Sequence, residues 1–402
     1  MSRTEAVIVD AARTPVGKYG GLLRDIRPDD LSALIIKSLL QRTGLDPCLI
    51  QDVMWGCANQ AGEDNRNVGR MGALLAGVPS SVPATTLNRL CGSSLDAINQ
   101  SARAIWSDDL DIIVAGGVES MSRAPYSIPK NQSGAYGNVV AYDTALGWRY
   151  PNPQMEKLFP LESMGETAEN VADKYKIGRE DQDRFACESH RKAVAAQTTG
   201  RFNEEIVAVE IPQGKGSAAP VNQDEGPRPD TSMEKLAAFQ PVFRKGGTVT
   251  AGNSSSLNDG AAAVLLMSGQ RVRELGMKPM ARVVATGLAG VDPQYMGIGP
   301  ITAVRQALKK AGLNINQIDL VELNEAFAAQ SLAVIRELQI DLAKLNVNGG
   351  SIALGHPLGC SGARIMTTLL HEMKRRNVRY GLATMCIGVG QGIATIVENL
   401  SL

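Results

Sequence analysis

The hydrophobic positions of the chain follow two alternating periods. LDIIVAG at 110–116 is a continuous apolar run, which predicts a buried strand. The segment before it carries apolar residues at helical spacing, namely Leu95, Ile98, Ala102 and Ile105. A second helical stripe lies downstream and consists of Met366, Leu369, Leu370 and Met373. Strands that alternate with helices in this way predict the α/β class, with mixed sheets that are covered by helices.

The same order of elements occurs twice along the chain. Three pairs of segments share a pattern. In the first pair each segment predicts a helix, a Gly-Leu turn and a strand; in the second, a turn, a helix and a buried strand. In the third pair each segment predicts a strand, a turn with glycine and a strand. The paired segments are 34–60 with 303–329, 86–117 with 348–386, and 248–268 with 383–400. An ordered recurrence of this kind predicts a duplicated fold.

The duplication divides the chain into three parts. One half consists of residues 1–121 and 248–270, and the other of residues 277–402. The intervening residues 122–247 are an insertion. It begins with a polar segment rich in Gly, Pro, Asn and Tyr and continues with a segment of helical pattern. Because insertions of this size usually cover a site, we predict a loop domain over the functional centre.

Charge and hydropathy exclude several classes of protein. The chain has 41 Lys plus Arg residues and 41 Asp plus Glu residues, so it has no excess of positive charge. The composition therefore gives no reason to predict a nucleic acid or an anionic membrane as partner. No apolar run reaches the roughly 20 residues that a membrane helix needs. The first residues, MSRTEAVIVDAART, read as a strand and not as a signal peptide, which predicts a cytoplasmic protein.

The six cysteines include no CxxC pair, which argues against a zinc ribbon or a thioredoxin site, and we predict no metal. Cys91 follows an extended segment and precedes the predicted helix SSLDAINQSARAI. A thiol at a helix N-terminus has a lowered pKa, which favours the nucleophilic thiolate, and the amides around it could hold an oxyanion. The alternative interpretation is a buried core cysteine beside a tight turn.

Only three histidines are present, and His356 lies in the glycine-rich segment GGSIALGHPLGCSGAR. A histidine in such a turn is not a routine helix-face residue, although it could simply bind turn carbonyls. Cys386 precedes the pattern GxGxG, which on its own is weak evidence for a dinucleotide site. Ten residues remain after Gly392, too few for a βαβ unit, so we predict a hairpin that brings the backbone close to a ligand.

Asn324 and Glu325 end the repeated strand of the second half, where the first half has Cys57 and Ala58. Polar groups at one strand end and apolar groups at its counterpart predict a site that belongs to the second half. The alternative is that Asn324 caps the following helix.

Six segments resemble, in order, the successive signatures of the thiolase family. They are LNRLCGSSLDA, AGGVESMSRAP, TVTAGN, LNEAFAAQ, NGGSIALGHPLGCSGAR and GLATMCIGVGQG. The resemblance implies a thiolase-like fold, in which two duplicated α/β halves with mixed five-stranded sheets form an αβαβα arrangement, plus the inserted loop domain as a cover for coenzyme A (CoA). It also implies a homodimer or a homotetramer.

The resemblance assigns roles to residues that match the family's motifs. Cys91 is similar to the acyl-accepting nucleophile, His356 to the histidine that activates it, and Cys386 to the cysteine that moves the proton of the acetyl unit. Asn324 matches the asparagine that holds a water in one oxyanion site. Gly388 and the N–H group of Cys91 match the donors of the other oxyanion site.

Other matches concern the two ends of the substrate. Arg228 resembles the arginine on the adenine side of CoA, and Ser255 the serine near the pantetheine arm. Met164 and Met296 lie where the family lines its acyl pocket. CoA and its thioesters are the substrates implied, and no permanently bound cofactor or metal is required.

The resemblance further predicts an acetyl-CoA C-acyltransferase that cleaves a 3-oxoacyl-CoA with CoA. GCANQAGEDNRNVGRM and DTALGWRYPNPQM resemble 3-oxoadipyl-CoA thiolases of aromatic degradation, whereas NRLCGSS and GHPLGCSGARIMTTLL resemble the 3-ketoacyl-CoA thiolases of fatty-acid β-oxidation. Ser163 stands where many acetoacetyl-CoA thiolases have a histidine. The alternatives are an acetoacetyl-CoA thiolase that runs the Claisen condensation, a decarboxylating ketosynthase, and a non-catalytic carrier of acyl-CoA or lipid.

Overall fold

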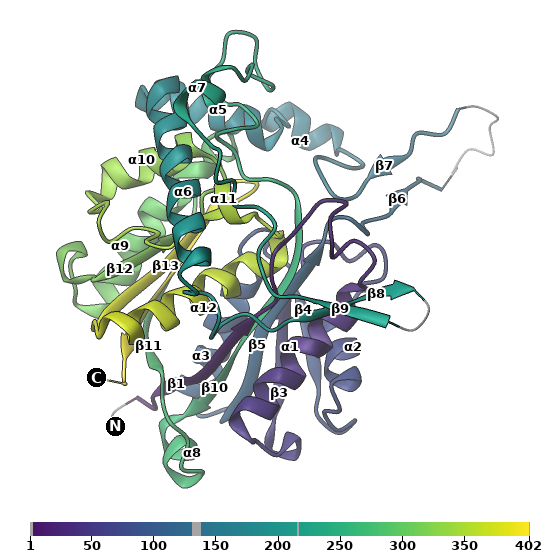
Figure 1. Ribbon diagram of the computed structural model, residues 1–402, viewed down its shortest axis with the longest axis vertical. Helices are drawn as coiled ribbons and strands as arrows, with labels where there is room; N and C mark the ends of the chain where they lie inside the picture. Colours follow the sequence, from purple (N-terminus) through teal and green to yellow (C-terminus); the bar gives the residue numbers. More distant parts are fainter. Residues whose placement is uncertain (1–2, 131–137, 215–216, 402) are drawn as a thin grey trace.

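One large mixed sheet organises the molecule (Figure 1). The computed structural model describes residues 3–130, 138–214 and 217–401. From one edge the first half supplies β4 (Ala84–Leu87), β3 (Asp52–Gly56), β5 (Ile112–Ser120), β10 (Asn258–Ser268) and β1 (Ala6–Arg13), and the short β2 (Gly17–Lys18) also pairs with β10. The second half continues the sheet with β11 (Ala281–Gly290), β14 (Gln391–Asn399), β13 (Tyr380–Ile387) and β12 (Leu320–Leu323).

The mixed sheets of the two halves, which the family resemblance implies, join edge to edge. β1 and β11 pair only through Val7↔Arg282 and Ile8↔Ala281. Both strands carry an irregularity directly after this contact, in their pairing with β10 and β14, and such bulges bend strands apart. Among the described residues, the second half contributes four strands to the sheet. Where β3 pairs with β4 in the first half, β12 makes a single parallel bridge to Leu345. Asn346 has a φ of 41°, which ends the extended backbone there.

The predicted duplication is visible in matching elements. Helix α1 (Pro28–Thr43) ends at Gly44 and helix α9 (Gly299–Ala311) ends at Gly312, both with a φ of 66°. Only glycine adopts this left-handed cap without strain, which explains why both copies of the helix stop at a Gly-Leu pair. Helices α3 (Ser93–Trp106) and α12 (Leu358–Arg376) are likewise followed by β5 and β13.

Helices form the layers around the sheet. The stripes predicted on α3 and α12 meet in one buried cluster between the two halves of the sheet. Helices α1 and α2 (Val68–Leu75) cover the other face of the first half, whereas α9 and α10 (Ala328–Leu338) cover that of the second half. The resulting order of layers is αβαβα, as the resemblance implies. None of the described helices combines the length and apolarity needed to cross a membrane.

The insertion adds its own elements, of which the helices lie above the sheet and β8 (Val209–Gly214) and β9 (Ser217–Val221) lie beside the first half (Figure 1). The helices and the other strands are β6 (Tyr126–Ser127), β7 (Tyr142–Asp143), α4 (Pro153–Leu158), α5 (Met164–Tyr175), α6 (Arg179–Thr198) and α7 (Met233–Ala237). The strands described in it form two small separate sheets. Arg13 of β1 holds the insertion through buried ion pairs to Glu205 (2.6 Å) and Asp224 (2.7 Å). The exact domain boundaries stay a prediction.

Candidate active site

Cys91 lies between β4 and α3, in a turn that side-chain hydrogen bonds hold in place. Leu90 has a φ of 46°, an uncommon backbone conformation for a residue with a side chain. The hydroxyl of Ser93 accepts the Arg89 N–H group (2.9 Å) and donates to the Leu90 carbonyl (2.6 Å), while Asn88 Oδ1 accepts the Leu90 N–H group (2.8 Å). These bonds hold the strained turn and present Cys91 just before the helix begins at Ser93.

The electrostatics of Cys91 differ from the sequence prediction. Burial raises the pKa of Cys91 to about 11, although hydrogen bonds from the N–H groups of Gly388 and of Cys91 itself lower it. The expected lowered pKa is therefore wrong for the free protein, because loss of water outweighs the backbone amides. In the resting site Cys91 is a neutral thiol, so its nucleophilic form requires a base.

The turn after β13 brings Gly388 against the nucleophile. β13 and β14 form the predicted hairpin, and the connecting turn has positive φ at Val389 (61°) and Gly390 (78°). A Cβ atom on Gly388 would lie 3.3 Å from both Leu90 Cδ1 and Met164 Sδ, so the backbone amide approaches the Cys91 turn closely. Glycine here allows that approach.

Cys386 ends the same strand and is buried beside the predicted acyl pocket. It belongs to an apolar cluster that includes Met296, with Met164 packed against it. Burial raises the pKa of Cys386 strongly, and the charge of a Cys91 thiolate raises it further. The two sulfur atoms therefore lie close enough to interact electrostatically, and Cys386 keeps its proton while Cys91 is charged.

Asn324 connects this strand end to His356. Its N–H group donates to the Thr384 carbonyl (3.0 Å), two residues before Cys386. Its side-chain Nδ2 lies 3.4 Å from His356 Nε2, and His356 N donates to Asn258 Oδ1 (2.9 Å). Helix α10 begins at Ala328 with Phe327 as its cap, so the alternative role of Asn324 as a helix cap is wrong.

His356 is a neutral base in this environment. Burial, followed by the nearby Arg364, lowers its pKa to about 3, so the imidazole is uncharged at neutral pH. The turns that carry Cys91, Cys386 and His356 thus converge on the end of β13 through Gly388 and Asn324.

A cavity of about 610 Å³ is lined by residues of the insertion and of both halves. Among the residues that line it are Arg228 of the insertion and Ile352 and Ala353, just before the His356 turn. Ser254 and Ser256 also line it, whereas the intervening Ser255 donates its N–H group to the Ala326 carbonyl (2.9 Å). The predicted adenine-side arginine therefore borders the same space as Ile352 and Ala353, which precede the His356 turn.

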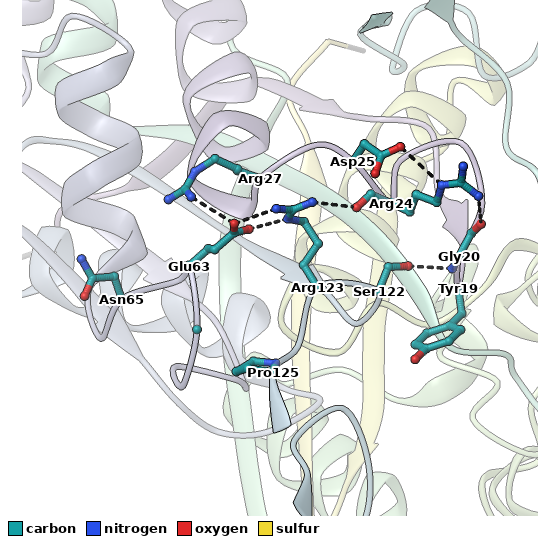
Figure 2. A pocket seen from close by; sticks show the side chains of 11 residues that line it. Tyr19, Gly20, Arg24, Asp25, Arg27, Glu63, Asn65, Ser122, Arg123 and Pro125 are labelled. Carbon is teal, nitrogen blue, oxygen red and sulfur yellow. Dashed lines mark hydrogen bonds and ion pairs between the residues drawn. The ribbon is translucent and has the colours of Figure 1, made fainter. Parts of the chain in front are cut away.

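A second cavity, of about 750 Å³, lies elsewhere on the first half (Figure 2). Figure 2 shows Arg27 and Arg123 both meeting the Glu63 carboxylate, and Arg24 beside Asp25. None of the predicted site residues lines this cavity. Each of its three arginines has a carboxylate partner, and Arg27 also pairs with Asp29 outside the lining.

Comparison with known proteins agrees with this geometry. The family model "Thiolase, N-terminal domain" matches residues 6–270, and "Thiolase, C-terminal domain" matches residues 277–399. The chain belongs to the thiolase family. Thiolases are acyltransferases, and this chain is an enzyme of that class.

Curated and solved thiolases resemble this one over their full length. The 3-oxoadipyl-CoA/3-oxo-5,6-dehydrosuberyl-CoA thiolase of Escherichia coli K12 is 53% identical over 98% of this chain and 100% of that protein. The beta-ketoadipyl-CoA thiolase of Pseudomonas aeruginosa is 52% identical over 100% of both chains. The crystal structure of human mitochondrial 3-ketoacyl-CoA thiolase in complex with CoA is 42% identical, with a TM-score of 0.92, over 99% of this chain and 98% of that one.

Some residues of this thiolase site were not predicted from the sequence. His190 of α6 is 6% exposed, lines the cavity of about 610 Å³ and accepts the Arg228 N–H group at Nδ1 (3.2 Å). Ser351 and Arg364 contact the polar chain that ends at His356. Nothing in one sequence distinguishes these from other buried polar residues, because their partners are distant along the chain.

Replacement of His190 by leucine is expected to weaken CoA binding without slowing the chemistry. The leucine leaves the Arg228 N–H group without its acceptor, and a lost hydrogen bond costs about 1 kcal/mol. We expect KM for CoA to rise about fivefold to tenfold while kcat changes less than about twofold. Steady-state kinetics in CoA would measure both. His190→Asn, which retains an acceptor near the Nδ1 position, is the matched control, and equal KM values for the two variants would contradict the role.

Proposed function

We propose that this thiolase cleaves 3-oxoadipyl-CoA with CoA, giving acetyl-CoA and a shortened acyl-CoA. The observation that carries the reaction is the convergence of Cys91, Gly388, Cys386, Asn324 and His356 at one strand end. Support for the substrate comes from the curated relatives with this activity in their names, which are 50–53% identical over nearly the full chain.

The first half-reaction forms an acyl-enzyme. His356 Nε2 accepts the proton of Cys91 as the sulfur attacks the 3-oxo carbon of the substrate. Because both groups are neutral at rest, we infer that proton transfer accompanies the attack. The oxyanion that forms takes over the N–H groups of Cys91 and Gly388, which hold the sulfur in the free protein.

Carbon–carbon cleavage follows from collapse of this intermediate. The bond between C2 and C3 breaks, and its electron pair remains on the acetyl unit as an enolate. Its thioester oxygen carries the negative charge, and the imidazolium of His356 together with a water held by Asn324 would stabilise it. Cys386 donates its proton to the enolate carbon, which releases acetyl-CoA.

The second half-reaction regenerates the enzyme. The proton on His356 returns to Cys386, and His356 then deprotonates the thiol of an incoming CoA. The CoA thiolate attacks the Cys91 thioester, and the shortened acyl-CoA leaves as Cys91 recovers its thiol through His356. Exchange of one thioester for another is nearly isoenergetic, so no redox or metal chemistry enters any of these steps.

The acetoacetyl-CoA alternative has less support at the site. Ser163 precedes Met164 and forms a capping box with Glu166, whose N–H group it accepts (3.3 Å) and whose carboxylate accepts the Ser163 N–H group (2.8 Å). The residue is thus engaged with its own helix. One relative at 50% identity does carry the name acetyl-CoA acetyltransferase, so the two substrates must be compared directly.

A direct comparison of substrates tests the proposal. Thiolysis rates are measured with 3-oxoadipyl-CoA, acetoacetyl-CoA and a medium-chain 3-oxoacyl-CoA at matched CoA concentrations. We expect kcat/KM for 3-oxoadipyl-CoA to exceed the others at least about tenfold, which corresponds to about 1.4 kcal/mol in the transition state. A higher kcat/KM for either of the other two would contradict the substrate, and no thiolysis at all would contradict the reaction.

We also infer that the enzyme acts as a homodimer or a homotetramer. β4 forms one edge of the large sheet, where an open strand can pair with a second copy. Sedimentation of the purified chain would establish the number of subunits, and a monomer would contradict this inference.

A further inference from the structure

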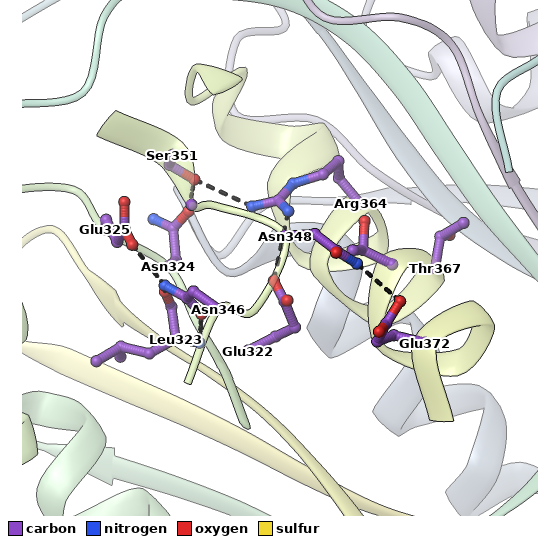
Figure 3. A network of polar contacts seen from close by, with 12 residues as sticks. Glu322, Leu323, Asn324, Glu325, Asn346, Asn348, Ser351, Arg364, Thr367 and Glu372 are labelled. Carbon is purple, nitrogen blue, oxygen red and sulfur yellow. Dashed lines mark hydrogen bonds and ion pairs between the residues drawn. The ribbon is translucent and has the colours of Figure 1, made fainter. Parts of the chain in front are cut away.

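A chain of buried polar groups leads from Arg364 to the amide of Asn324 (Figure 3). Arg364 Nη2 donates to Ser351 Oγ (3.1 Å), and the Ser351 hydroxyl donates to Asn324 Oδ1 (2.6 Å). Figure 3 shows Ser351 between the two partners. Ser351 and Asn324 are 0% exposed and Arg364 is 1% exposed, so water does not compete for these bonds.

The direction of the chain follows from what each group can do. A guanidinium only donates hydrogen bonds, so the Ser351 oxygen accepts from Arg364 and its proton points to Asn324 Oδ1. This fixes the orientation of the amide and turns Nδ2 toward His356 Nε2, at 3.4 Å. Because Nδ2 only donates, Nε2 must accept and therefore carries no proton.

The opposite side of the imidazole leads to the same assignment. The Ser361 hydroxyl donates to the Pro357 carbonyl (2.9 Å), which only accepts. Its oxygen is then free to accept the Nδ1–H group of His356, at 2.6 Å. The side chains from Arg364 to Ser361 thus form one chain of contacts. It begins at a guanidinium that can only donate and ends at the Pro357 carbonyl, which can only accept.

We propose that Ser351 and Arg364 are positioning residues that hold His356 as the Nδ1–H tautomer, with the Nε2 lone pair available to Cys91. The role of His356 as the base rests on the proposed function. The contact between Nδ2 and Nε2 is long for a hydrogen bond, so little free energy is lost when Nε2 accepts the Cys91 proton instead. Neither Ser351 nor Arg364 needs to touch the substrate.

Charged groups around the imidazole are consistent with this role. Arg364 of α12 faces the imidazole and itself pairs with Glu322 of β12 (3.5 Å), whose pKa burial raises to about 8. Glu119 of β5 accepts the Gly359 N–H group (2.8 Å) in the following turn. From β10, Asn258 provides a neutral contact to the His356 amide. These groups leave the imidazole neutral, so its tautomer depends on the chain of hydrogen bonds.

Ser351→Ala removes the link that orients Asn324. The amide can then turn Oδ1 toward Nε2, which favours a protonated Nε2 and raises the pKa of His356. We expect kcat for thiolysis to fall about tenfold with KM for CoA unchanged. The rate of Cys91 alkylation by iodoacetamide should fall as well, and the acid limb of the pH profile of kcat should move toward neutral pH.

Two further variants separate positioning from simple packing. Thr367→Val is the matched control, because the buried Thr367 hydroxyl donates to the Ala363 carbonyl of its own helix (2.8 Å). This variant should leave rates and pH profiles unchanged. Ser351→Thr retains the hydroxyl and should recover most of the activity. Equal effects of Ser351→Ala and Thr367→Val, or an unmoved acid limb, would overturn the proposal.

The alkylation arm needs no acyl-CoA, so it distinguishes failure of this inference from failure of the proposed function. If Ser351→Ala does not fold, the wild-type enzyme provides the decisive measurement. The chain has three histidines, so 15N-histidine NMR can assign the His356 resonances by comparison with a His356→Gln variant. An unprotonated Nε2 and a protonated Nδ1 are expected, and the reverse pattern would overturn the proposal.

Discussion

Cys91→Ala is expected to abolish the acyl-enzyme and to lower kcat for thiolysis by at least about 10⁴-fold. The variant keeps the N–H donors and the imidazole but has no sulfur to accept the acyl group, so only binding and oxyanion stabilisation remain. Intact-protein mass spectrometry after incubation with acetyl-CoA would detect the missing acyl adduct. Cys48→Ala, at an exposed thiol, is the control and should acylate normally.

The pH dependence of the Cys91 alkylation rate provides a second test of this residue. Because burial raises its pKa to about 11, the thiolate fraction in the free enzyme increases throughout the neutral and alkaline range. Alkylation of Cys91 by iodoacetamide should therefore accelerate as pH rises. A rate that is already at its plateau at neutral pH would show that the site holds a preformed thiolate, and an acyl adduct on Cys91→Ala would place the nucleophile elsewhere.

Cys386→Ser is expected to separate acylation from carbon–carbon chemistry. Proton transfer to the enolate by a positioned group contributes about 10²–10⁴-fold, so cleavage of a 3-oxoacyl-CoA should fall by about 10³-fold. Transfer of an acetyl group from acetyl-CoA to Cys91 needs no proton at the α-carbon and should continue. Exchange of labelled CoA into acetyl-CoA measures the second process, and thiolysis measures the first.

The position of Cys386 supports this division of roles. Burial raises the pKa of Cys386, so Cys386 still carries its proton when the enolate forms beside it. Cys360→Ser, at another buried thiol, is the matched control for the loss of a buried sulfur and should retain thiolysis. If Cys386→Ser retained full thiolysis, the proton donor would have to be another group.

Local chemistry made much of this fold predictable. The helical stripes on α3 and α12 are buried as predicted, and the Gly-Leu pairs at 44 and 312 do end matching helices. The hairpin after Cys386 follows from the glycines and from the few residues that remain. These features depend on neighbours within a few residues, which a sequence displays directly.

Electrostatics could not be predicted in the same way. A cysteine before a helix predicts a lowered pKa, yet burial reverses the sign at Cys91. Burial depends on the second half and on the insertion, since Gly388 and Met164 approach the turn from positions far along the chain. The continuous sheet likewise depends on a two-residue contact between β1 and β11 that leaves no local pattern.

The sequence by itself determined the family, the duplicated α/β fold and the residue types of the site, because each is encoded in short segments with their own periodicity or motif. The tertiary structure alone decided which protons those residues carry. The neutral Cys91, the proton retained by Cys386 and the Ser351–Asn324–His356 chain all arise from desolvation and from hydrogen bonds between distant segments. Both depend on atoms that meet only when the two halves are folded together.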